Sequence, residues 1–330
     1  MSNDTSSSIA SLETPLTRTI KLIIFSVPLG PSLLCSLYIF ICVIHERQLR
    51  RRANHVMIAI ILIDFLNLMS DLIPISLSYF YTGHVRSLSI CLYWVTGNYT
   101  LQGISSWLMA WASIDRYLLI FFHRLRDTFL RHDVPILGLC AFVVGWYITV
   151  TFTHSCRENW FDGTQFLCGG PCFASSTVIL TVDWILIVLL PTLVIVAFNI
   201  LLLGRVIFQK CRRRPGFEGR SFTWRKNRKL LIQLLAIIIV YFITQLPLAI
   251  FSIVRLFGPA DFLLDISLIW LFYTPYLIYI IIPFAYIATT KECRKQICGW
   301  QRRVAIAPTG PTYRLKTLTK SMATNNPDYR

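Results

Sequence analysis

Charged residues are scarce in this chain of 330 residues, of which they make up 15%. A soluble domain of this size carries roughly a quarter charged residues. The chain also lacks an internal repeat, which is the signature of many transporters. Its six histidines lie near the ends of apolar segments and form no cluster with metal-ligand spacing. These absences argue against a soluble domain, a repeat-built transporter and a metal-dependent membrane enzyme.

What the chain has instead is apolar sequence, with 55% hydrophobic residues and a mean hydropathy of +0.59. Blocks of about 20 residues or more are long enough to cross a bilayer as helices. Seven such blocks can be distinguished, at about 20–44, 54–80, 88–122, 133–153, 174–208, 224–256 and 262–289. Each contains a few polar residues, as expected for helices packed around a wet interior. The sequence therefore predicts an all-α membrane protein, a seven-transmembrane helix bundle spanning residues 20–289.

The basic residues are distributed unevenly over this seven-span arrangement. One side holds 25 of the 32 Lys and Arg, and the other holds five, namely Arg18, Lys21, Arg86, Arg157 and Arg255. Basic residues accumulate in cytoplasmic loops, so the N-terminus is expected outside and the C-terminal tail in the cytoplasm. The net charge of +16 is then a topology signal, with attraction to anionic membrane lipid as a secondary effect. No nucleic-acid partner is expected.

The outer side begins with a polar, Ser/Thr-rich tail over residues 1–19. No cleavable signal peptide is expected there, because no basic segment precedes an apolar core. Asn3 begins a glycosylation sequon, Asn3-Asp4-Thr5. Four of the ten cysteines also fall on this side, where disulfides persist. Four cysteines allow three pairings.

The cytoplasmic end after the seventh block contains a short basic stretch, KECRKQICGW, within residues 290–300. We expect it to form an amphipathic juxtamembrane helix along the inner leaflet. Cys293 and Cys298 are palmitoylation candidates, with ordinary reduced thiols as the alternative. Residues 301–330 have no apolar period and are expected to be a disordered cytoplasmic tail.

Near the end of the third block stand three polar residues, Asp115-Arg116-Tyr117. An acid and an arginine at the edge of a membrane-spanning helix are costly unless a partner or water meets them, and together they form a switchable pair. Cys91 lies 25 residues before Arg116, which is about 37 Å of helix. A helix anchored outside at Cys91 and ending in an ion pair inside could transmit a signal across the membrane.

With these residues the chain resembles a class A (rhodopsin-like) G-protein-coupled receptor over roughly residues 20–298. The resemblance rests on landmarks that occur in order at matching spacings. These are Asp64 ten residues after Asn54, Cys91, Ser105, the triplet Asp115-Arg116-Tyr117, Trp146, Pro191, Pro247, and Pro283 with Tyr286 in Ile282-Pro283-Phe284-Ala285-Tyr286.

The resemblance implies a plasma-membrane receptor, not an enzyme, that passes an extracellular ligand signal to a heterotrimeric G-protein. Prolines kink helices because each removes a backbone hydrogen bond, and in the family such kinks let helix 6 swing outward. Arg116 is then expected to turn from Asp115 toward the G-protein. The implied coupling residues are Asp115, Arg116, Tyr117, Pro247, Pro283 and Tyr286.

The chain also departs from the family pattern. Gln245 replaces the helix 6 tryptophan and Ile282 the helix 7 asparagine, while no acid occupies the cytoplasmic start of helix 6. We expect a weakened resting state, so a constitutively active or decoy receptor is the alternative within the family. Asp64 and Ser105 form a candidate sodium site, with a neutral, structural Asp64 as the alternative. No other cofactor is expected, and a polytopic transporter or channel is the alternative of a different class.

The resemblance places the ligand pocket between helices 3, 5, 6 and 7. Asn98 stands where amine receptors carry aspartate, and Tyr276 where opsins carry the retinal lysine. The candidate lining residues are Asp71, Asn98, Gln102, Asp183, Gln245, Arg255 and Tyr276, although the intramembrane acids could equally have structural roles. The family pairs a loop cysteine with Cys91. We expect Cys172 in this role, with a second bridge between Cys156 and Cys168, and such a stapled, aromatic-rich lid favours a peptide ligand.

Overall fold

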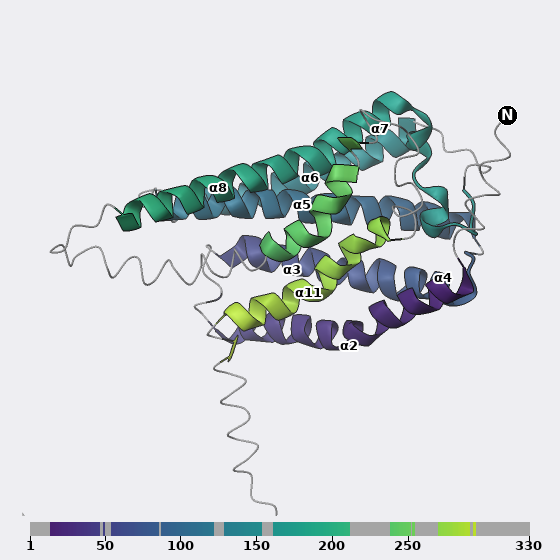
Figure 1. The fold of residues 1–330 in the computed structure, drawn as a ribbon, viewed down its shortest axis with the longest axis horizontal. Coiled ribbons are helices and arrows are strands. Elements are labelled where there is room, and N and C mark those ends of the chain that lie inside the picture. Colours follow the sequence, from purple (N-terminus) through teal and green to yellow (C-terminus); the bar gives the residue numbers. More distant parts are fainter. Residues whose placement is uncertain are drawn as a thin grey trace, which may run out of the picture.

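The structure is a computed structural model, and it describes residues 14–46, 49, 54–85, 87–121, 129–153, 161–211, 238–251, 253–254, 270–290 and 293–294. Within these ranges the backbone forms helices and short turns and no strand. Figure 1 shows the long helices running side by side along the long axis of the molecule. The predicted all-α class is confirmed for this part of the chain.

The helices follow the apolar blocks. The long ones are α2 (Pro15–His45), α3 (His55–Asn67), α5 (Leu88–Phe121), α6 (Phe129–Thr153), α8 (Leu190–Cys211), α11 (Thr274–Thr289) and an unlabelled helix over Ile238–Phe251. The short ones are α4 (Leu77–Thr82) and α7 (Thr177–Asp183), the π-helices η2 (Leu68–Ser76) and η7 (Trp184–Leu189), and the 3-10 turns η5 (Phe166–Gly169), η6 (Cys172–Ser175) and η9 (Leu271–Tyr273).

Five helical stretches of the described chain are long and apolar enough to cross a membrane, namely Pro15–His45, His55–Thr82, Asp133–Thr153, Thr177–Arg205 and Leu271–Thr289. Many of their large apolar side chains are exposed, as are those of Ile238–Phe251; Leu34 is 69% and Ile243 is 70% exposed. A soluble monomer rarely exposes apolar surface on this scale. The chain is therefore a membrane protein.

The start of α2 shows how local chemistry sets a boundary that hydropathy misses. Thr14 caps the helix, because its Oγ1 accepts a hydrogen bond of 3.3 Å from the backbone N–H of Thr17. Pro15 follows at the first position, where a missing N–H costs nothing. The helix thus begins at Pro15, earlier than the apolar block that starts near residue 20.

Two of the spans widen into π-helical turns. η2 contains Asp71 and Pro74, and η7 directly follows Asp183 and precedes Pro191. Such turns are rare and often occur at functional sites. Asp71 and Asp183, which are both buried, therefore lie within or directly beside a turn that departs from regular α-helical geometry.

The central helix is α5, which packs against α3, α6 and α8. Gly103 allows a close approach on one face, since an added Cβ would lie 2.9 Å from Val143 Cγ1 and 3.2 Å from Ile187 Cγ2. Small residues let membrane helices pack closely in this way. α5 is thus held against both α6 and η7 at this level.

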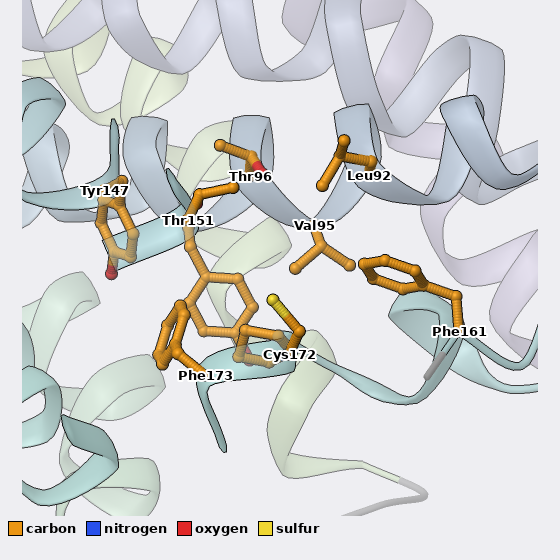
Figure 2. A pocket seen from close by; sticks show the side chains of 10 residues that line it. Leu92, Val95, Thr96, Tyr147, Thr151, Phe161, Cys172 and Phe173 are labelled. Atoms are coloured by element: carbon orange, nitrogen blue, oxygen red, sulfur yellow. The ribbon is translucent and has the colours of Figure 1, made fainter. Parts of the chain in front are cut away.

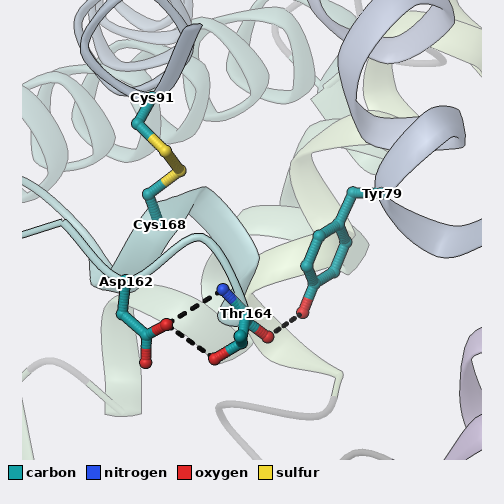
Figure 3. Close-up of a disulfide and its surroundings, with 5 residues drawn as sticks. All are labelled: Tyr79, Cys91, Asp162, Thr164 and Cys168. Atoms are coloured by element: carbon teal, nitrogen blue, oxygen red, sulfur yellow. Dashed lines mark hydrogen bonds between the residues drawn. A yellow bond between two sulfur atoms is a disulfide. The ribbon is translucent and has the colours of Figure 1, made fainter. Parts of the chain in front are cut away.

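A disulfide joins the N-terminal part of α5 to the loop before α7. Cys91 and Cys168 are bonded, with their Cα atoms 5.7 Å apart (Figure 3). The predicted pairings of Cys91 with Cys172 and of Cys156 with Cys168 are therefore wrong. The reason is local, because Leu167 and Cys168 adopt positive φ angles of 50° and 49° and turn the backbone back under α5. Cys172 is itself disulfide-bonded.

The loop is further ordered by a turn around Asp162. Its Oδ1 accepts hydrogen bonds from Thr164 N (2.9 Å) and Thr164 Oγ1 (2.6 Å), and its Oδ2 accepts one from Gln165 Nε2 (2.9 Å). Tyr79 OH donates to the carbonyl of Thr164 at 3.2 Å (Figure 3). Burial raises the pKa of Asp162, but the hydrogen bonds from Thr164 and Gln165 outweigh it and hold that pKa below its ordinary value. The ionised carboxylate thereby fixes the loop against α4.

Candidate functional site

The end of the bundle that carries the Cys91–Cys168 bond, called here the disulfide end, contains a buried carboxylate, Asp71. Its Oδ1 accepts hydrogen bonds from Trp94 Nε1 (2.6 Å) and Ser76 Oγ (2.8 Å). Its Oδ2 accepts from Tyr276 OH (2.8 Å) and from Asn98 Nδ2. The Asp71 side chain is 3% exposed. These five residues, the Asp71 network, tie η2, α5 and α11 together through a carboxylate whose acceptor sites are used.

Aromatic side chains cover this network. Phe166 of η5 lies 4.1 Å from Tyr273 and 5.3 Å from Trp94, measured between ring centroids. Lys21 of α2 is buried, and its Nζ lies 3.7 Å from the centroid of the Tyr273 ring. Aromatic pairs and a desolvated cation over a ring are both stabilising. The disulfide end is therefore closed on the side of α2 and α4 by a packed aromatic cluster.

A cavity opens on the other side of Asn98, with about 620 Å³ of space between atoms, part of it open to solvent. We call it the polar cavity. It lies between α5, α6, η7, the helix Ile238–Phe251 and α11, and Leu167 of the loop also lines it. Four predicted ligand-pocket residues line it, Asn98, Gln102, Asp183 and Gln245.

The other three predicted pocket residues lie elsewhere. Asp71 and Tyr276 belong to the Asp71 network and are not among the described residues that line the polar cavity. Asn98 lines the cavity and also donates to both of them, so it separates them from it. That Asp71 and Tyr276 contact a ligand therefore stays a prediction, and Arg255 lies outside the described residues.

Asp183 differs from Asp71 in how few donors it has. Its Oδ1 accepts a hydrogen bond of 2.8 Å from Trp146 Nε1. The carboxylate lies within electrostatic range of Tyr99 and Tyr147. Tyr147 OH is buried and has no hydrogen-bond partner in the part of the chain that the structure describes. Asp183 is itself 4% exposed, so a buried acid and an unpaired hydroxyl stand together at the cavity wall.

A second, smaller pocket of about 270 Å³ lies behind this wall, and we call it the apolar pocket. Figure 2 shows Leu92, Val95 and Thr96 of α5 facing Cys172 and Phe173 of the loop. Tyr99 and Tyr147 line both this pocket and the polar cavity. Their ring centroids are 6.2 Å apart, and the pair therefore forms the partition between the two spaces.

Deeper in the bundle, Asp64 and Ser105 are in contact as expected, with a hydrogen bond of 2.8 Å from Ser105 Oγ to Asp64 Oδ1. Asp64 Oδ2, both polar atoms of the Asn67 side chain and Tyr279 OH are buried without a hydrogen-bond partner among the described residues. Tyr279 lies within electrostatic range of Asp64. Buried orphan polar atoms are rare in proteins, so this group is suited to hold water or a cation.

The opposite end of the bundle, called here the Arg116 end, buries the predicted switch residues. Asp115 is 1%, Arg116 4% and Tyr286 1% exposed. Arg116 lies within electrostatic range of Asp115 and of Tyr286, and its Nη1 has no hydrogen-bond partner in the described part of the chain. The structure therefore brings together the end of α5 and the end of α11, which are far apart in the sequence.

Contacts between α5 and α8 also belong to the Arg116 end. Tyr117 packs edge-on against Phe198, with centroids 5.7 Å apart, and Arg205 lies over the Tyr117 ring. Asn199 donates to Ser113 Oγ at 3.0 Å. The Arg116 end thus has an α5–α8 interface in which polar contacts accompany aromatic packing.

The two predicted hinge prolines lie inside helices. Pro283 is within α11, and Pro247 is within Ile238–Phe251. Each removes one backbone hydrogen bond and permits a bend. On the surface of the Arg116 end, His55 Nδ1 and Asp133 Oδ1 are 2.8 Å apart and join α3 to α6.

Of the residues predicted to be modified, the structure describes Cys293. Cys293 is 0% exposed, and Tyr38 OH donates to its carbonyl oxygen at 2.8 Å. Palmitoylation at Cys293 stays a prediction, and it would require this buried side chain to become accessible. Asn3, Cys156 and Cys298 lie outside the described residues.

Sequence reasoning missed the aromatic and hydroxyl lining of the polar cavity, namely Tyr99, Ser106, Tyr147, Trp184 and Tyr241. Ser106 follows Gln102 by four residues, so helical spacing could have placed it on the same face. Tyr99 follows Asn98 and Trp184 follows Asp183, but nothing in the sequence positions of Tyr99, Tyr147 or Trp184 marks them as lining a cavity.

Comparison with known proteins agrees with this arrangement. The family model of the 7 transmembrane receptor (rhodopsin family) matches residues 35–286, which is more than half of the chain. A comparison with curated proteins found no match. The matched range includes the polar cavity, Asp64 and the buried Asp115-Arg116 pair. The chain therefore belongs to the 7 transmembrane receptor family of the rhodopsin type.

Proposed function

We propose that this family member is a plasma-membrane G-protein-coupled receptor, in which an extracellular ligand occupies the polar cavity and the Arg116 end activates a heterotrimeric G-protein. The disulfide end faces the outside, where disulfides persist. The uneven distribution of Lys and Arg supports the same orientation. The function requires no catalytic residue, and the chain is not proposed to be an enzyme.

One observation carries this proposal, namely that a single helix connects the two sites. α5 supplies Asn98 and Gln102 to the polar cavity and Asp115 and Arg116 to the opposite end. Gln102 and Arg116 are 14 residues apart, which is about 21 Å along the helix. A shift or rotation of α5 at one end would therefore also move its side chains at the other end.

The buried state of Arg116 suggests how the receptor is held at rest. With 4% of its surface exposed, Arg116 cannot meet a G-protein unless the helices around it move. Bends at Pro247 and Pro283 would allow that movement, and Tyr286 is already close to the guanidinium. A ligand that binds the open arrangement better than the closed one shifts the population toward it.

The group around Asp64 fits a sodium ion. Asp64 Oδ2 and Ser105 Oγ would hold the ion, and Asn67 Oδ1 lies one helical turn along the same face as Asp64. The ion would supply a positive charge that neutralises the buried carboxylate and ties α3 to α5. A neutral, protonated Asp64 bonded to Ser105 is the alternative.

The test is nucleotide exchange on purified G-protein by the full chain in lipid nanodiscs, beside Arg116→Ala at matched receptor amount. Exchange by the unliganded chain that is lost in Arg116→Ala is expected if the resting state is weakly held. Asp133→Asn is the control, because it removes a charge from a surface pair at the same end and should leave exchange unchanged. Exchange that persists fully in Arg116→Ala would rule out this mechanism.

Three other functions predict different results. A constitutively active receptor, favoured by Gln245 and Ile282 in place of the family's tryptophan and asparagine, would show high exchange that no ligand increases. A decoy receptor would bind ligand and show no exchange in any variant. Ion or solute flux across lipid vesicles that contain the purified chain would indicate a channel or transporter instead.

A further inference from the structure

We infer that the ligand of the polar cavity binds through a cationic group, an ammonium or a guanidinium, whose charge is held by Asp183. The inference rests on the proposed receptor function and goes beyond it by naming the chemistry of the ligand. It follows from the charge of the cavity, its aromatic walls and the polar groups opposite Asp183.

Among the described residues that line the cavity, one carries a charge. Among the described residues that line it, Asp183 is the one acid and no base is present. The carboxylate is 4% exposed, its Oδ1 accepts a hydrogen bond from Trp146 Nε1, and the Tyr147 hydroxyl lies beside it. Asp71, at a similar depth, accepts four hydrogen bonds from protein donors. A buried carboxylate is costly unless it is paired, so Asp183 requires a partner that Asp71 does not.

The walls around Asp183 are suited to a cation. Tyr99, Tyr147, Trp184 and Tyr241 all line the same cavity. Aromatic faces attract cations, most strongly where water is excluded. The hydroxyl of Tyr147, unpaired and buried beside Asp183, can accept a further hydrogen bond from an N–H group. An acid, an acceptor hydroxyl and aromatic rings together form a site for an ammonium or guanidinium.

The opposite wall adds acceptors and makes an anionic ligand unfavourable. Asn98 uses its Nδ2 as a donor to Asp71 and Tyr276, which leaves Oδ1 as the atom with which it can meet a ligand. That oxygen accepts hydrogen bonds and cannot donate them. A carboxylate or phosphate would therefore meet an acceptor at Asn98 and a negative charge at Asp183. The cavity thus selects a ligand that carries donors, with its positive charge toward η7.

Two sources could present such a group, a small organic amine or amidine and the basic side chain of a peptide. The experiment measures direct binding to the purified full-length receptor in nanodiscs by calorimetry, with no G-protein present. Benzamidine, benzamide and benzoate have one shape and three charges, and they form the small-molecule arm. The peptide arm compares a capped Phe-Arg dipeptide with its citrulline analogue, which is neutral at the same position.

The expected result is that at least one cationic probe binds roughly tenfold or more tightly than its neutral isostere. Asp183→Asn should weaken that cation by roughly 10- to 100-fold, as for loss of a charge-assisted hydrogen bond, and leave the neutral probe unchanged. Trp146→Phe keeps the carboxylate and should keep the preference for the cation. Asp162→Asn removes the same charge from the loop, outside the cavity, and should also keep it.

The inference is overturned if neither benzamidine nor the arginine dipeptide binds better than its neutral isostere, or if Asp183→Asn retains the preference. Should Asp183→Asn fail to fold, the ranking of probes on the wild-type receptor and on Asp183→Glu decides the question. Failure here beside Arg116-dependent nucleotide exchange would remove the cationic ligand and leave the receptor function standing. Cation binding without Arg116-dependent exchange would leave the cationic ligand standing and remove the receptor function.

Discussion

The Asp71 network gives a stability prediction that can be worked out from the hydrogen bonds. Trp94→Phe removes one donor, the indole N–H that lies 2.6 Å from Asp71 Oδ1. Both atoms are buried, since Trp94 is 1% and Asp71 3% exposed. Water therefore cannot replace the lost donor without opening the packing between α5 and η2.

The magnitude follows from the type of bond. A hydrogen bond to a charged group contributes about 1.5–3 kcal/mol to folding, whereas hydrogen bonds between membrane helices average about 0.6 kcal/mol. The bond to Asp71 should lie toward the upper range, because the carboxylate is shared by three other donors that hold it in place. We expect Trp94→Phe to lower the free energy of unfolding by about 1.5–3 kcal/mol beyond the loss of packing.

The same helix offers a control for the packing term. Trp107 lies on α5, and its Nε1 is buried without a hydrogen-bond partner among the described residues. Trp107→Phe thus removes an indole N–H that bonds to nothing. Unfolding of each variant in mixed detergent and SDS micelles gives the two free energies, and their difference estimates the contribution of the hydrogen bond.

A double-mutant cycle corrects for the greater exposure of Trp107. The cost of Trp94→Phe should fall to the packing term alone when Asp71 has already been replaced in Asp71→Leu. Equal costs of Trp94→Phe in the wild-type and Asp71→Leu backgrounds would refute the reasoning, because the carboxylate and the indole would then be energetically independent.

Two further predictions concern the loop at the disulfide end. Cys168→Ser and Cys91→Ser should each lower the free energy of unfolding by about 2–4 kcal/mol, and the double variant should lose no more than either single variant. The effect of Cys172→Ser should add to theirs. Thermal unfolding measures these effects, and additive losses for Cys91→Ser and Cys168→Ser would contradict the pairing. Because the pKa of Asp162 is held below its ordinary value, its contribution is complete at neutral pH and is lost as the pH falls below about 4. Hydrogen exchange at the amide of Thr164 should accelerate there, and Asp162→Ala should show fast exchange at every pH; a pH-independent rate in the wild type would count against this.

The spans could be predicted from sequence because hydropathy over about 20 residues is what places a helix in a membrane. The third block, expected at about 88–122, is α5 over Leu88–Phe121. The exact start of α2 could not be predicted, since it depends on the Thr14 cap, and the π-turns at Asp71 and Asp183 leave no mark in hydropathy. Helical periodicity predicts on which face of a helix a residue lies, but it does not predict whether a neighbouring side chain covers that residue.

The same limit applies to the site. Asn98, Gln102, Asp183 and Gln245 line the polar cavity, in keeping with the rule that polar residues inside spans rarely face lipid. Asp71 is instead hydrogen-bonded to Asn98, which lines the cavity. The partner of Cys91 was missed for another reason. Which loop cysteine reaches α5 depends on a reversal that begins at Leu167 and Cys168, two non-glycine residues with positive φ angles that residues of their type rarely adopt.

The continuity of α5 has a consequence for how its length can vary. Over Leu88–Phe121 it contains no proline, in contrast to α2, α6 and α11. One residue inserted between Gln102 and Arg116 would rotate one end of the helix against the other by about 100° and advance it by about 1.5 Å. Asn98 would leave Asp71, or Arg116 would leave Tyr286. An insertion of seven residues, close to two full turns, restores the face but lengthens the rod by roughly 10 Å. The number of residues in this segment is therefore fixed by geometry at both of its ends, independently of which residues they are.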